Sequence, residues 1–304
     1  MTYYAGIDAG QSATKAVIGD AEGRVIGHGS GPPADEVAQS AASTRLHDAL
    51  RVALEDASRD AGLQDGVQFR AIVAGISGYE GRVYGHAPAL PSANLQLVHD
   101  SIVAHVAAFG EGPGVVVIAG TGTVAYGTDA SGESVTLGGW GYLFGDEGGA
   151  FWIGRRLIER AMRDEDVAAP TRLESAVLKH FDASSLRALA RAFYSGEIER
   201  RHVAAFAQHA FEMQDQRIEE AAEIIRQAAD RVAALGAQTA RRLHGNKRVL
   251  GEPAPLAFTG GLMRNADFAR LVAARARDRL PEAVLVSLTR EPEEGALALA
   301  RRYG

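Results

Sequence analysis

The stretch Gly6-Ile-Asp-Ala-Gly-Gln-Ser-Ala-Thr-Lys15 decides the fold that is predicted for this chain. The alternating residues Thr2 to Asp8 predict a strand, and Lys15 to Asp20 predict the next one. Glycine in the turn between them lets successive backbone N–H groups face one concave spot, where Ser12 and Thr14 add hydroxyl donors. Such a unit suits phosphate groups. The alternative is a glycine hairpin that an Asx-turn closes.

The same order of elements is predicted a second time. Arg24 to His28 continues the first set as a third strand. After Glu111-Gly-Pro-Gly114, three further strands are predicted around a glycine turn, Gly120-Thr-Gly122, at Val115 to Ala119, Thr123 to Thr128 and Ser134 to Leu137. Two sets of three strands, each followed by helices, predict two similar α/β halves with a ligand cleft between them.

The remaining segments complete this outline. A helical pattern follows Asp35 and ends at Gly62, and a long helix is predicted within Asp215 to His244. We expect a first domain at residues 1–112, a second at 113–290, and a terminal helix at 291–304 that packs back on the first. Further strands are predicted at Arg70 to Ile76, Leu95 to Val98, Leu256 to Phe258 and Val284 to Ser287, and a helix at Ser101 to Phe109.

Bulk composition excludes several classes of protein. A chain of 304 residues favours two domains, and its net charge of −6 argues against a nucleic-acid partner. The absence of cysteine excludes disulfides and cysteine-held iron–sulfur clusters. The N-terminus has no secretory pattern, and no apolar run is long enough to span a bilayer. We expect a cytoplasmic protein without a membrane partner.

Two further loops repeat the phosphate-binding pattern. Gly120-Thr-Gly-Thr123 follows the first strand of the second half, and Thr259-Gly-Gly261 opens a helix after a later strand. No Gly-Lys-Ser/Thr occurs, so this is not a Walker loop, and the first loop leads into a strand, which excludes a Rossmann fingerprint. The three loops predict a nucleotide site at Gly10, Gln11, Ser12, Thr14, Lys15, Thr121, Gly122, Thr123, Gly260 and Gly261. Lys15 lies on an alternating strand, so facing solvent is its alternative.

One carboxylate is a candidate metal ligand. Asp8 ends the first strand beside the phosphate loop. Mg²⁺ prefers carboxylate and water ligands, so Asp8 could hold it directly or through water.

The second informative stretch is Gly138-Gly-Trp-Gly-Tyr-Leu-Phe-Gly-Asp-Glu-Gly148. Trp140 offers a flat apolar face that suits a sugar ring or an acetamido methyl, although ordinary core packing is its alternative. Asp146 offers two acceptor oxygens for adjacent sugar hydroxyls. The flanking glycines allow the backbone to approach a ligand closely.

These motifs resemble a known family. The phosphate loops resemble those of the ATPase domain that sugar kinases, actin and Hsp70 share. The tryptophan-bearing stretch is similar to the signature of N-acetylglucosamine kinases in the BadF/BadG/BcrA/BcrD ATPase group. The resemblance extends from Gly6 to the segment Glu294-Gly-Ala296. It implies two ribonuclease H-like (actin-like ATPase) domains with an interdomain cleft.

Site residues follow from the resemblance. Asp100, in Leu97-Val-His-Asp-Ser-Ile102, lies where a strand ends and a helix begins, and a helix N-cap is its structural alternative. The resemblance matches Asp100 to the family's catalytic carboxylate, which orients the attacking hydroxyl and accepts its proton. The resemblance implies sugar contacts at Asp35, Ser77, Gly78, Thr121, Gly122, Trp140, Asp146 and Ala150.

Two positions depart from the family's pattern. The first loop reads Asp-Ala-Gly-Gln where three glycines are common. Asp35 stands where the family presents an Asn to the sugar, and a carboxylate there would also favour an ammonium group. Glucosamine therefore stays open as a substrate, whereas Trp140 favours the acetylated sugar.

The expected activity is ATP- and Mg²⁺-dependent phosphorylation of the 6-hydroxyl of N-acetyl-D-glucosamine, a small-molecule amino sugar. Glucosamine kinase and N-acetylmuramic acid kinase are alternatives of the same class. An ATPase activator or switch protein without a sugar acceptor is an alternative of another class, but its iron–sulfur cluster needs cysteine. The resemblance also implies a homodimer.

Overall fold

The computed structural model describes residues 1–34, 40–168, 171–244 and 254–304. Its first half is built on a mixed sheet of five strands in the order β3-β2-β1-β4-β5. β1 runs antiparallel to β2 and parallel to β4, and β5 continues the parallel part. The strands are β1 (Tyr4–Ala9), β2 (Thr14–Gly19), β3 (Val25–Gly31), β4 (Ala71–Ile76) and β5 (Leu95–His99).

The second half repeats this topology. Its five strands have the order β10-β9-β6-β7-β8, in which β6, β7 and β8 are antiparallel while β9 and β10 are parallel to β6. The expected α/β fold with two repeated halves is therefore confirmed. The strands are β6 (Gly114–Ala119), β7 (Thr123–Thr128), β8 (Ser134–Gly138), β9 (Ala254–Thr259) and β10 (Ala283–Val286).

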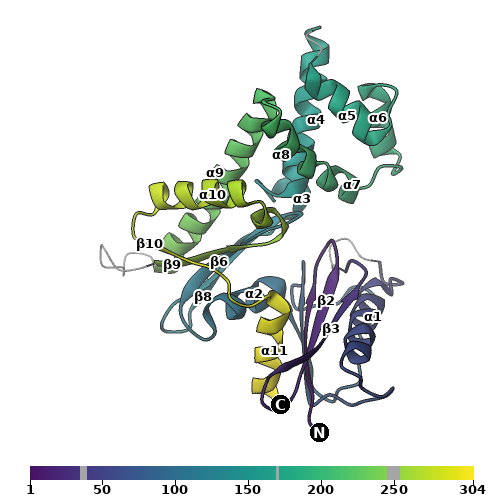
Figure 1. Ribbon diagram of the computed structural model, residues 1–304, viewed down its shortest axis with the longest axis vertical. Coiled ribbons are helices and arrows are strands. Elements are labelled where there is room, and N and C mark those ends of the chain that lie inside the picture. Colours follow the sequence, from purple (N-terminus) through teal and green to yellow (C-terminus); the bar gives the residue numbers. More distant parts are fainter. Residues whose placement is uncertain (35–39, 169–170, 245–253) are drawn as a thin grey trace.

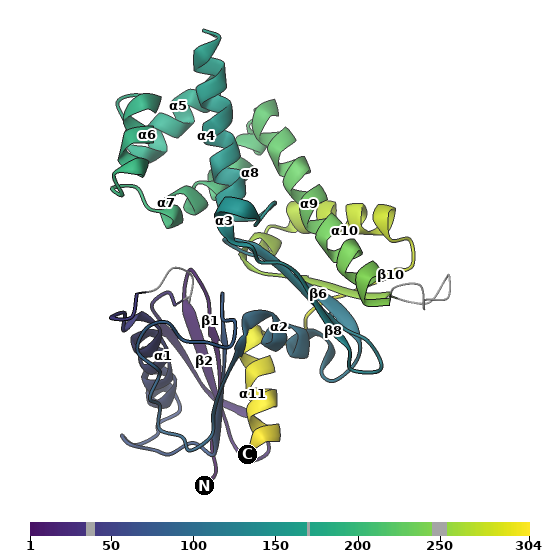
Figure 2. The same cartoon turned by 180° about the vertical axis from the view of Figure 1, so that it is seen from behind.

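Helices cover both faces of the first sheet, as Figure 1 shows. α1 (Arg45–Asp60) packs on one face, while α2 (Asp100–Phe109) and the C-terminal α11 (Pro292–Tyr303) pack on the other. α2 also packs on β6 and β7, so it lies between the two sheets. The C-terminal helix thus belongs spatially to the N-terminal strands, and the two chain ends lie near each other (Figure 2).

Alternating glycines in β3 allow α1 to approach the sheet at backbone distance. A Cβ on Gly29 would lie 2.2 Å from Ala53 O and 2.2 Å from Ala57 N. α1 also covers the edge of the sheet, because Asp56 and Asp60 accept hydrogen bonds from the β3 backbone at 3.0 and 2.8 Å. These side chains satisfy N–H groups that an open edge would expose.

The predicted helix after Asp35 begins later than expected. α1 starts at Arg45 with Thr44 at its N-cap, and residues 40–44 form a turn. Asp35 itself lies outside the described residues. Ala41 has the spacing of an apolar helix residue relative to Leu46 and the residues after it, but it lies in the turn before α1.

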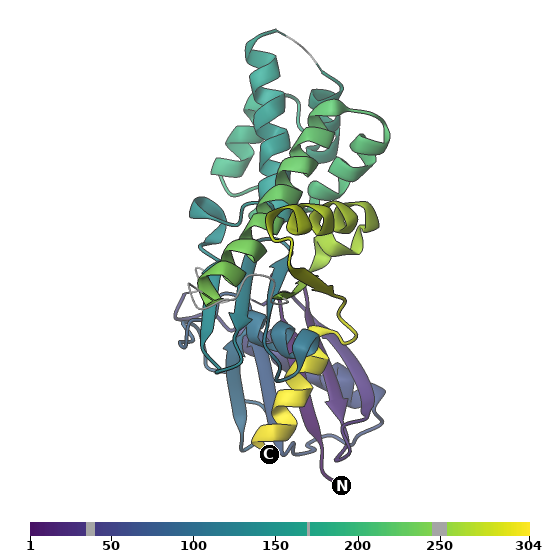
Figure 3. The same ribbon diagram turned by 90° about the vertical axis from the view of Figure 1, so that its left-hand side faces the viewer.

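The second sheet carries the longer helices. α9 (Glu219–His244) packs on β6, β7 and β8, and α10 (Ala266–Arg279) packs against α9. The helices after β8 extend away from the sheets, which gives the molecule the elongated outline of Figure 3. They are α3 (Gly141–Phe144), α4 (Ala150–Asp166), α5 (Arg172–Phe181), α6 (Leu186–Tyr194), α7 (Arg200–Ala205) and α8 (Ala207–Asp215), and η2 (Gly261–Arg264) follows β9.

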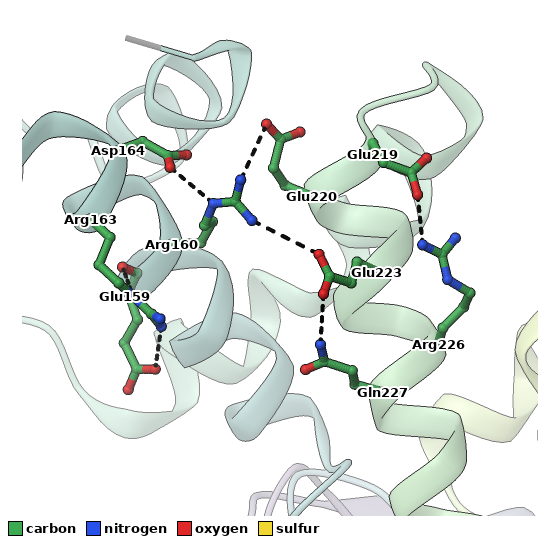
Figure 4. Close-up of polar contacts among 9 residues, drawn as sticks. All are labelled: Glu159, Arg160, Arg163, Asp164, Glu219, Glu220, Glu223, Arg226 and Gln227. Carbon is green, nitrogen blue, oxygen red and sulfur yellow. Dashed lines mark hydrogen bonds and ion pairs between the residues drawn. The ribbon is translucent and has the colours of Figure 1, made fainter. Parts of the chain in front are cut away.

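A charged network joins α4 to α9 (Figure 4). Arg160 on α4 binds Asp164 of its own helix at 2.9 Å and reaches Glu220 and Glu223 of α9 at 3.9 Å each. The two contacts that reach α9 are long and partly exposed, so each contributes at most about 1 kcal/mol. The apolar contacts of the two helices therefore provide most of their attachment. Among the described helices, none is both long enough and apolar enough to cross a bilayer.

Candidate active site

The carboxyl ends of three neighbouring strands bring the first half's candidate residues together. Ala9 at the end of β1 pairs with Ile76 of β4, which pairs with His99 of β5. The phosphate loop, Ser77 and Asp100 each follow one of these strands. They consequently share one edge of the sheet, which is where ligands of parallel α/β sheets bind.

Asp100 is the first residue of α2, and the N-cap is His99. The structural alternative for Asp100, a helix N-cap, is therefore wrong by one residue, because the extended His99 presents Nδ1 to the Ser101 N–H at 3.2 Å. His99 Nδ1 also lies 2.9 Å from Asp100 Oδ1, to which it donates only when it carries a proton, and in that form it no longer accepts from Ser101 N. Oδ1 is buried, and the described residues offer it no other hydrogen-bond donor. Asp100 thus keeps unused acceptor capacity at the sheet edge.

Asp8 lies in a strongly negative environment. Burial and the charges of Asp100 and Glu293 raise its pKa from 3.8 to about 8, although Lys15 opposes the shift. Lys15 Nζ instead lies 3.4 Å from Glu291 and 3.6 Å from Glu293 of α11. Uncompensated negative charge of this kind fits a divalent cation. Within the described ranges, no three acidic or histidine side chains form a complete metal cluster, so the remaining ligands would be water or phosphate oxygens.

The phosphate loops of the second half also adjoin each other. β6 and β9 are parallel and end together at the pair Ile118 and Thr259. A Cβ on Gly260, which has φ of 102°, would lie 2.5 Å from Ala119 O. The loop 120–122 is fixed from the other side, because Ala150 N at the start of α4 donates to Gly120 O at 2.9 Å. These two loops form one continuous backbone surface.

Asp146 is held rigidly beside the loop 120–122. Its side chain is 6 % exposed, and its backbone has φ of 57°, which is rare for a residue other than glycine. Asp146 Oδ1 accepts from Thr123 N at 3.2 Å, and Oδ2 lies 3.3 Å from Arg200 Nη2. Burial raises the pKa of Asp146, whereas the Thr123 N–H and the Arg200 charge lower it. The burial effect is the larger.

Hydrogen bonds connect the loops of the two sheets. Ser12 Oγ and Thr121 Oγ1 lie 3.2 Å apart, and Gln11 Oε1 accepts from Arg200 Nη2 at 2.8 Å. Gln11 also donates to Ser77 Oγ at 3.3 Å. We call this region, where the loops after β1 and β6 meet, the junction. It contains candidate nucleotide-binding and sugar-binding residues from both halves.

Other candidate residues lie away from the junction contacts or are engaged elsewhere. Thr14 is fully buried, and its hydroxyl donates to Pro32 O at 2.8 Å. Trp140 is 78 % exposed, at the N-cap of α3, so it is not a core residue. Gly78, with φ of 75°, follows Ser77 directly.

Two residues of this region are absent from the sequence-based predictions. Arg200 contacts both Gln11 and Asp146, and Glu293 is buried beside Lys15 with Oε2 unpartnered among the described residues. Arg200 lies in a helical region without a motif. Glu293 stands in a run of acids, Glu291-Pro-Glu-Glu294, that is typical of a helix start.

The two repeated halves, each with a glycine turn between its first two strands, have the actin-like ATPase fold. A model of the BadF/BadG/BcrA/BcrD ATPase family matches residues 5–300, and the chain belongs to this family. The family resemblance that the sequence motifs indicated is thereby confirmed.

Several known proteins are similar over their whole length. An N-acetyl-D-glucosamine kinase of Dictyostelium discoideum is 26 % identical, with 98 % of this chain and 97 % of the relative covered. A candidate N-acetylglucosamine kinase from Chromobacterium violaceum superposes with a TM-score of 0.78 at 24 % identity, covering 99 % of each chain. A ROK family glucokinase from Streptomyces griseus, solved with glucose and AMPPNP, has a TM-score of 0.58 at 18 % identity and covers 99 % of each chain. The two solved structures establish the fold alone.

Proposed function

We propose that this protein is an ATP-dependent kinase that phosphorylates the 6-hydroxyl of N-acetyl-D-glucosamine. The observation that carries the proposal is the junction itself. There Ser12 of the first phosphate loop contacts Thr121 of the second. Gln11 of the first loop accepts a hydrogen bond from Arg200, which also contacts the buried carboxylate Asp146. Membership of an ATPase family and the whole-length similarity to an N-acetyl-D-glucosamine kinase support the same conclusion.

The chemistry that we propose requires one base and two binding sites. Asp100 orients the 6-hydroxyl and accepts its proton as the oxygen attacks the terminal phosphorus of ATP. The bond between that phosphorus and the bridging oxygen breaks, and ADP leaves with the electron pair. The buried Oδ1 of Asp100 supports this role, because His99 Nδ1 at 2.9 Å is its one polar neighbour among the described residues and a carboxylate oxygen can accept a further hydrogen bond from a substrate hydroxyl. The products are the sugar 6-phosphate and ADP.

Binding of the two substrates is assigned to the loops. Residues 10–12, 121–123 and 260–261 would hold the nucleotide through backbone N–H and hydroxyl groups. Asp146 would accept two sugar hydroxyls, and Ser77 and Gly78 would approach the sugar from the first half. Asp8 would hold Mg²⁺, which neutralises phosphate charge when it is bound. The exposed indole of Trp140 is available to cover a sugar ring.

Two further assignments accompany the proposal. We place the boundary between the domains at residues 112 and 113, and the packing of α11 on β1 and α2 supports counting 291–304 with the first domain. A cytoplasmic location would give the enzyme access to ATP. A homodimer remains an expectation from the family resemblance.

A substrate panel tests the activity. Purified protein would receive Mg·ATP with glucose, glucosamine, N-acetylglucosamine or N-acetylmuramic acid, and ADP release would be recorded. We expect the highest kcat/KM with N-acetylglucosamine. A preference for glucosamine or N-acetylmuramic acid would replace the substrate but keep the reaction class. ADP release that no sugar stimulates would contradict the proposal.

A single substitution tests the base. Asp100→Asn should lower kcat by about 10²–10⁴-fold, the usual contribution of a general base, while sugar binding is largely kept. Asp65→Asn, at an exposed turn of the same half, is the matched control and should leave kcat unchanged. Full activity of Asp100→Asn would show that another group accepts the proton.

A further inference from the structure

Arg200 occupies an unusual position for an arginine of a peripheral helix. It is the first residue of α7 in the second half, yet its side chain is only 19 % exposed. Its guanidinium carbon lies 4.8 Å from the ring centroid of Tyr142 and 5.9 Å from that of Phe151. Both rings come from the segment that carries Asp146. The arginine is thus packed against the candidate sugar site.

The polar contacts of Arg200 point in two directions. Nη2 donates to Gln11 Oε1 at 2.8 Å, across the junction, and to Asp146 Oδ2 at 3.3 Å, within its own half. Gln11 in turn donates to Ser77 Oγ at 3.3 Å. A single amino group therefore joins the candidate sugar carboxylate to the tip of the first phosphate loop.

The energetics argue against a purely structural role for this arginine. Placing a guanidinium out of water is costly unless all its N–H groups are satisfied. Arg200 Nε is buried and has no partner among the described residues. The aromatic faces compensate only in part. A side chain that served stability alone would be replaced at low cost by an apolar one.

Arg200 also affects the charge state of Asp146. Burial raises the pKa of this carboxylate, and the guanidinium and the Thr123 N–H are the two groups that lower it. An ionised Asp146 accepts sugar hydroxyls through both oxygens, whereas a protonated one has lost part of that capacity. Arg200 therefore favours the form of Asp146 that binds a sugar.

We propose that Arg200 is a positioning residue that couples the sugar site to the first phosphate loop, holding Asp146 for the sugar through one hydrogen bond and Gln11 for the phosphates through the other. The inference rests on the proposed function and extends it to a residue outside the motifs. It makes two separable predictions, one for sugar binding and one for catalysis.

The first measurement is sugar affinity without nucleotide. Arg200→Met keeps the bulk against Tyr142 but removes the donors, and it should weaken N-acetylglucosamine binding by about 10-fold or more, as expected for a lost hydrogen bond to a charged group. Arg200→Lys should restore only part of the affinity, because one ammonium cannot reproduce the planar fork and its stacking. Arg201→Ala, the exposed neighbour that pairs with Glu199, is the matched control and should bind as wild type. Isothermal titration calorimetry measures the affinity, and thermal unfolding verifies that each variant is folded.

The second measurement is a double-mutant cycle for kcat. Gln11→Ala should lower kcat while the sugar dissociation constant stays within about threefold of wild type. In the Arg200→Met background, Gln11→Ala should have little further effect, because the hydrogen bond is already absent.

Folded Arg200→Met with wild-type sugar affinity and kcat would overturn the inference while leaving the kinase assignment intact. Fully additive effects of the two substitutions on kcat would overturn the coupling. A wild-type protein that phosphorylates no amino sugar would overturn the proposed function and this inference together.

Discussion

Gly122→Ala tests whether Asp146 and the loop 120–122 form one rigid sugar site. The added Cβ would lie 2.4 Å from Asp146 Oδ2 and 2.5 Å from its Cγ, about 1 Å closer than ordinary van der Waals contact. The carboxylate is 6 % exposed, so it cannot turn freely into solvent. The loop cannot retreat either, because the Gly122 backbone packs closely on Gly149, where a Cβ would lie 2.9 Å from Gly122 Cα.

The magnitude follows from the contacts that a displaced carboxylate loses. A displaced Asp146 would lose its proposed hydrogen bond from a sugar hydroxyl, and a hydrogen bond to a charged group is worth about 1.5–3 kcal/mol. At about 1.4 kcal/mol per factor of ten, this corresponds to roughly 10- to 150-fold in affinity. We therefore expect sugar binding to weaken by a factor in this range.

The assay is calorimetric titration of N-acetylglucosamine in the absence of nucleotide. Gly120→Ala is the matched control, because its Cβ would meet no atom within 4 Å and its φ is not positive. It should keep wild-type sugar affinity. Folded Gly122→Ala protein that binds the sugar within threefold of wild type would refute the reasoning, either because Asp146 does not contact the sugar or because the loop yields.

Two further predictions concern stability. Gly29→Ala should lower the free energy of unfolding by about 2–3 kcal/mol, because its Cβ would lie 2.2 Å from Ala53 O and α1 would have to move. Ser30→Ala, on the exposed face of the strand, should change the free energy of unfolding by less than about 0.5 kcal/mol. Equal effects of the two substitutions in urea unfolding would contradict the packing argument. Burial lowers the pKa of His99, but the hydrogen bond to Asp100 and its charge outweigh burial, so the pKa is raised above 6.5. The protein therefore loses this stabilisation as the pH rises from 6.5 through the higher folded-state pKa of His99. His99→Asn, which can still cap α2, should lose less stability than wild type between pH 6 and 8. Identical losses in the two proteins would contradict the role of the His99 charge.

The architecture was predictable because its signals are local. Each strand of the two repeated units is a short apolar or alternating run between glycine turns, and its position depends on a few neighbouring residues. The strand expected at Thr123 to Thr128 has these same bounds in the structure. The helix after Asp35 was predicted less well, because apolar spacing at Ala41 imitates a helix that begins only at Arg45.

The N-cap of α2, next to the candidate base Asp100, was not predicted correctly from the sequence. The sequence placed Asp100 at the boundary between a strand and a helix, and the structure does so too. Which residue caps the helix depends on backbone geometry at one position, and His99 takes the cap with a ring nitrogen instead of a carboxylate. Residue preferences favour Asp at an N-cap, so the sequence alone indicates the wrong residue.

Arg200 could not be predicted for a different reason. Its partners are 54 and 189 residues away in the sequence, and only the packing of α7 against α4 brings the guanidinium to the junction. Nothing in the local pattern separates Arg200 from Arg201, which pairs with Glu199 and is 65 % exposed. One of two adjacent arginines contacts both candidate substrate sites while the other lies on the surface. Sequence motifs therefore identify the candidate ligand-binding loops, whereas the tertiary fold determines which side chains connect one loop to another. Comparing the sugar affinities of Arg200→Met and Arg201→Ala tests this distinction, because the two arginines are adjacent in the sequence but only Arg200 reaches the junction.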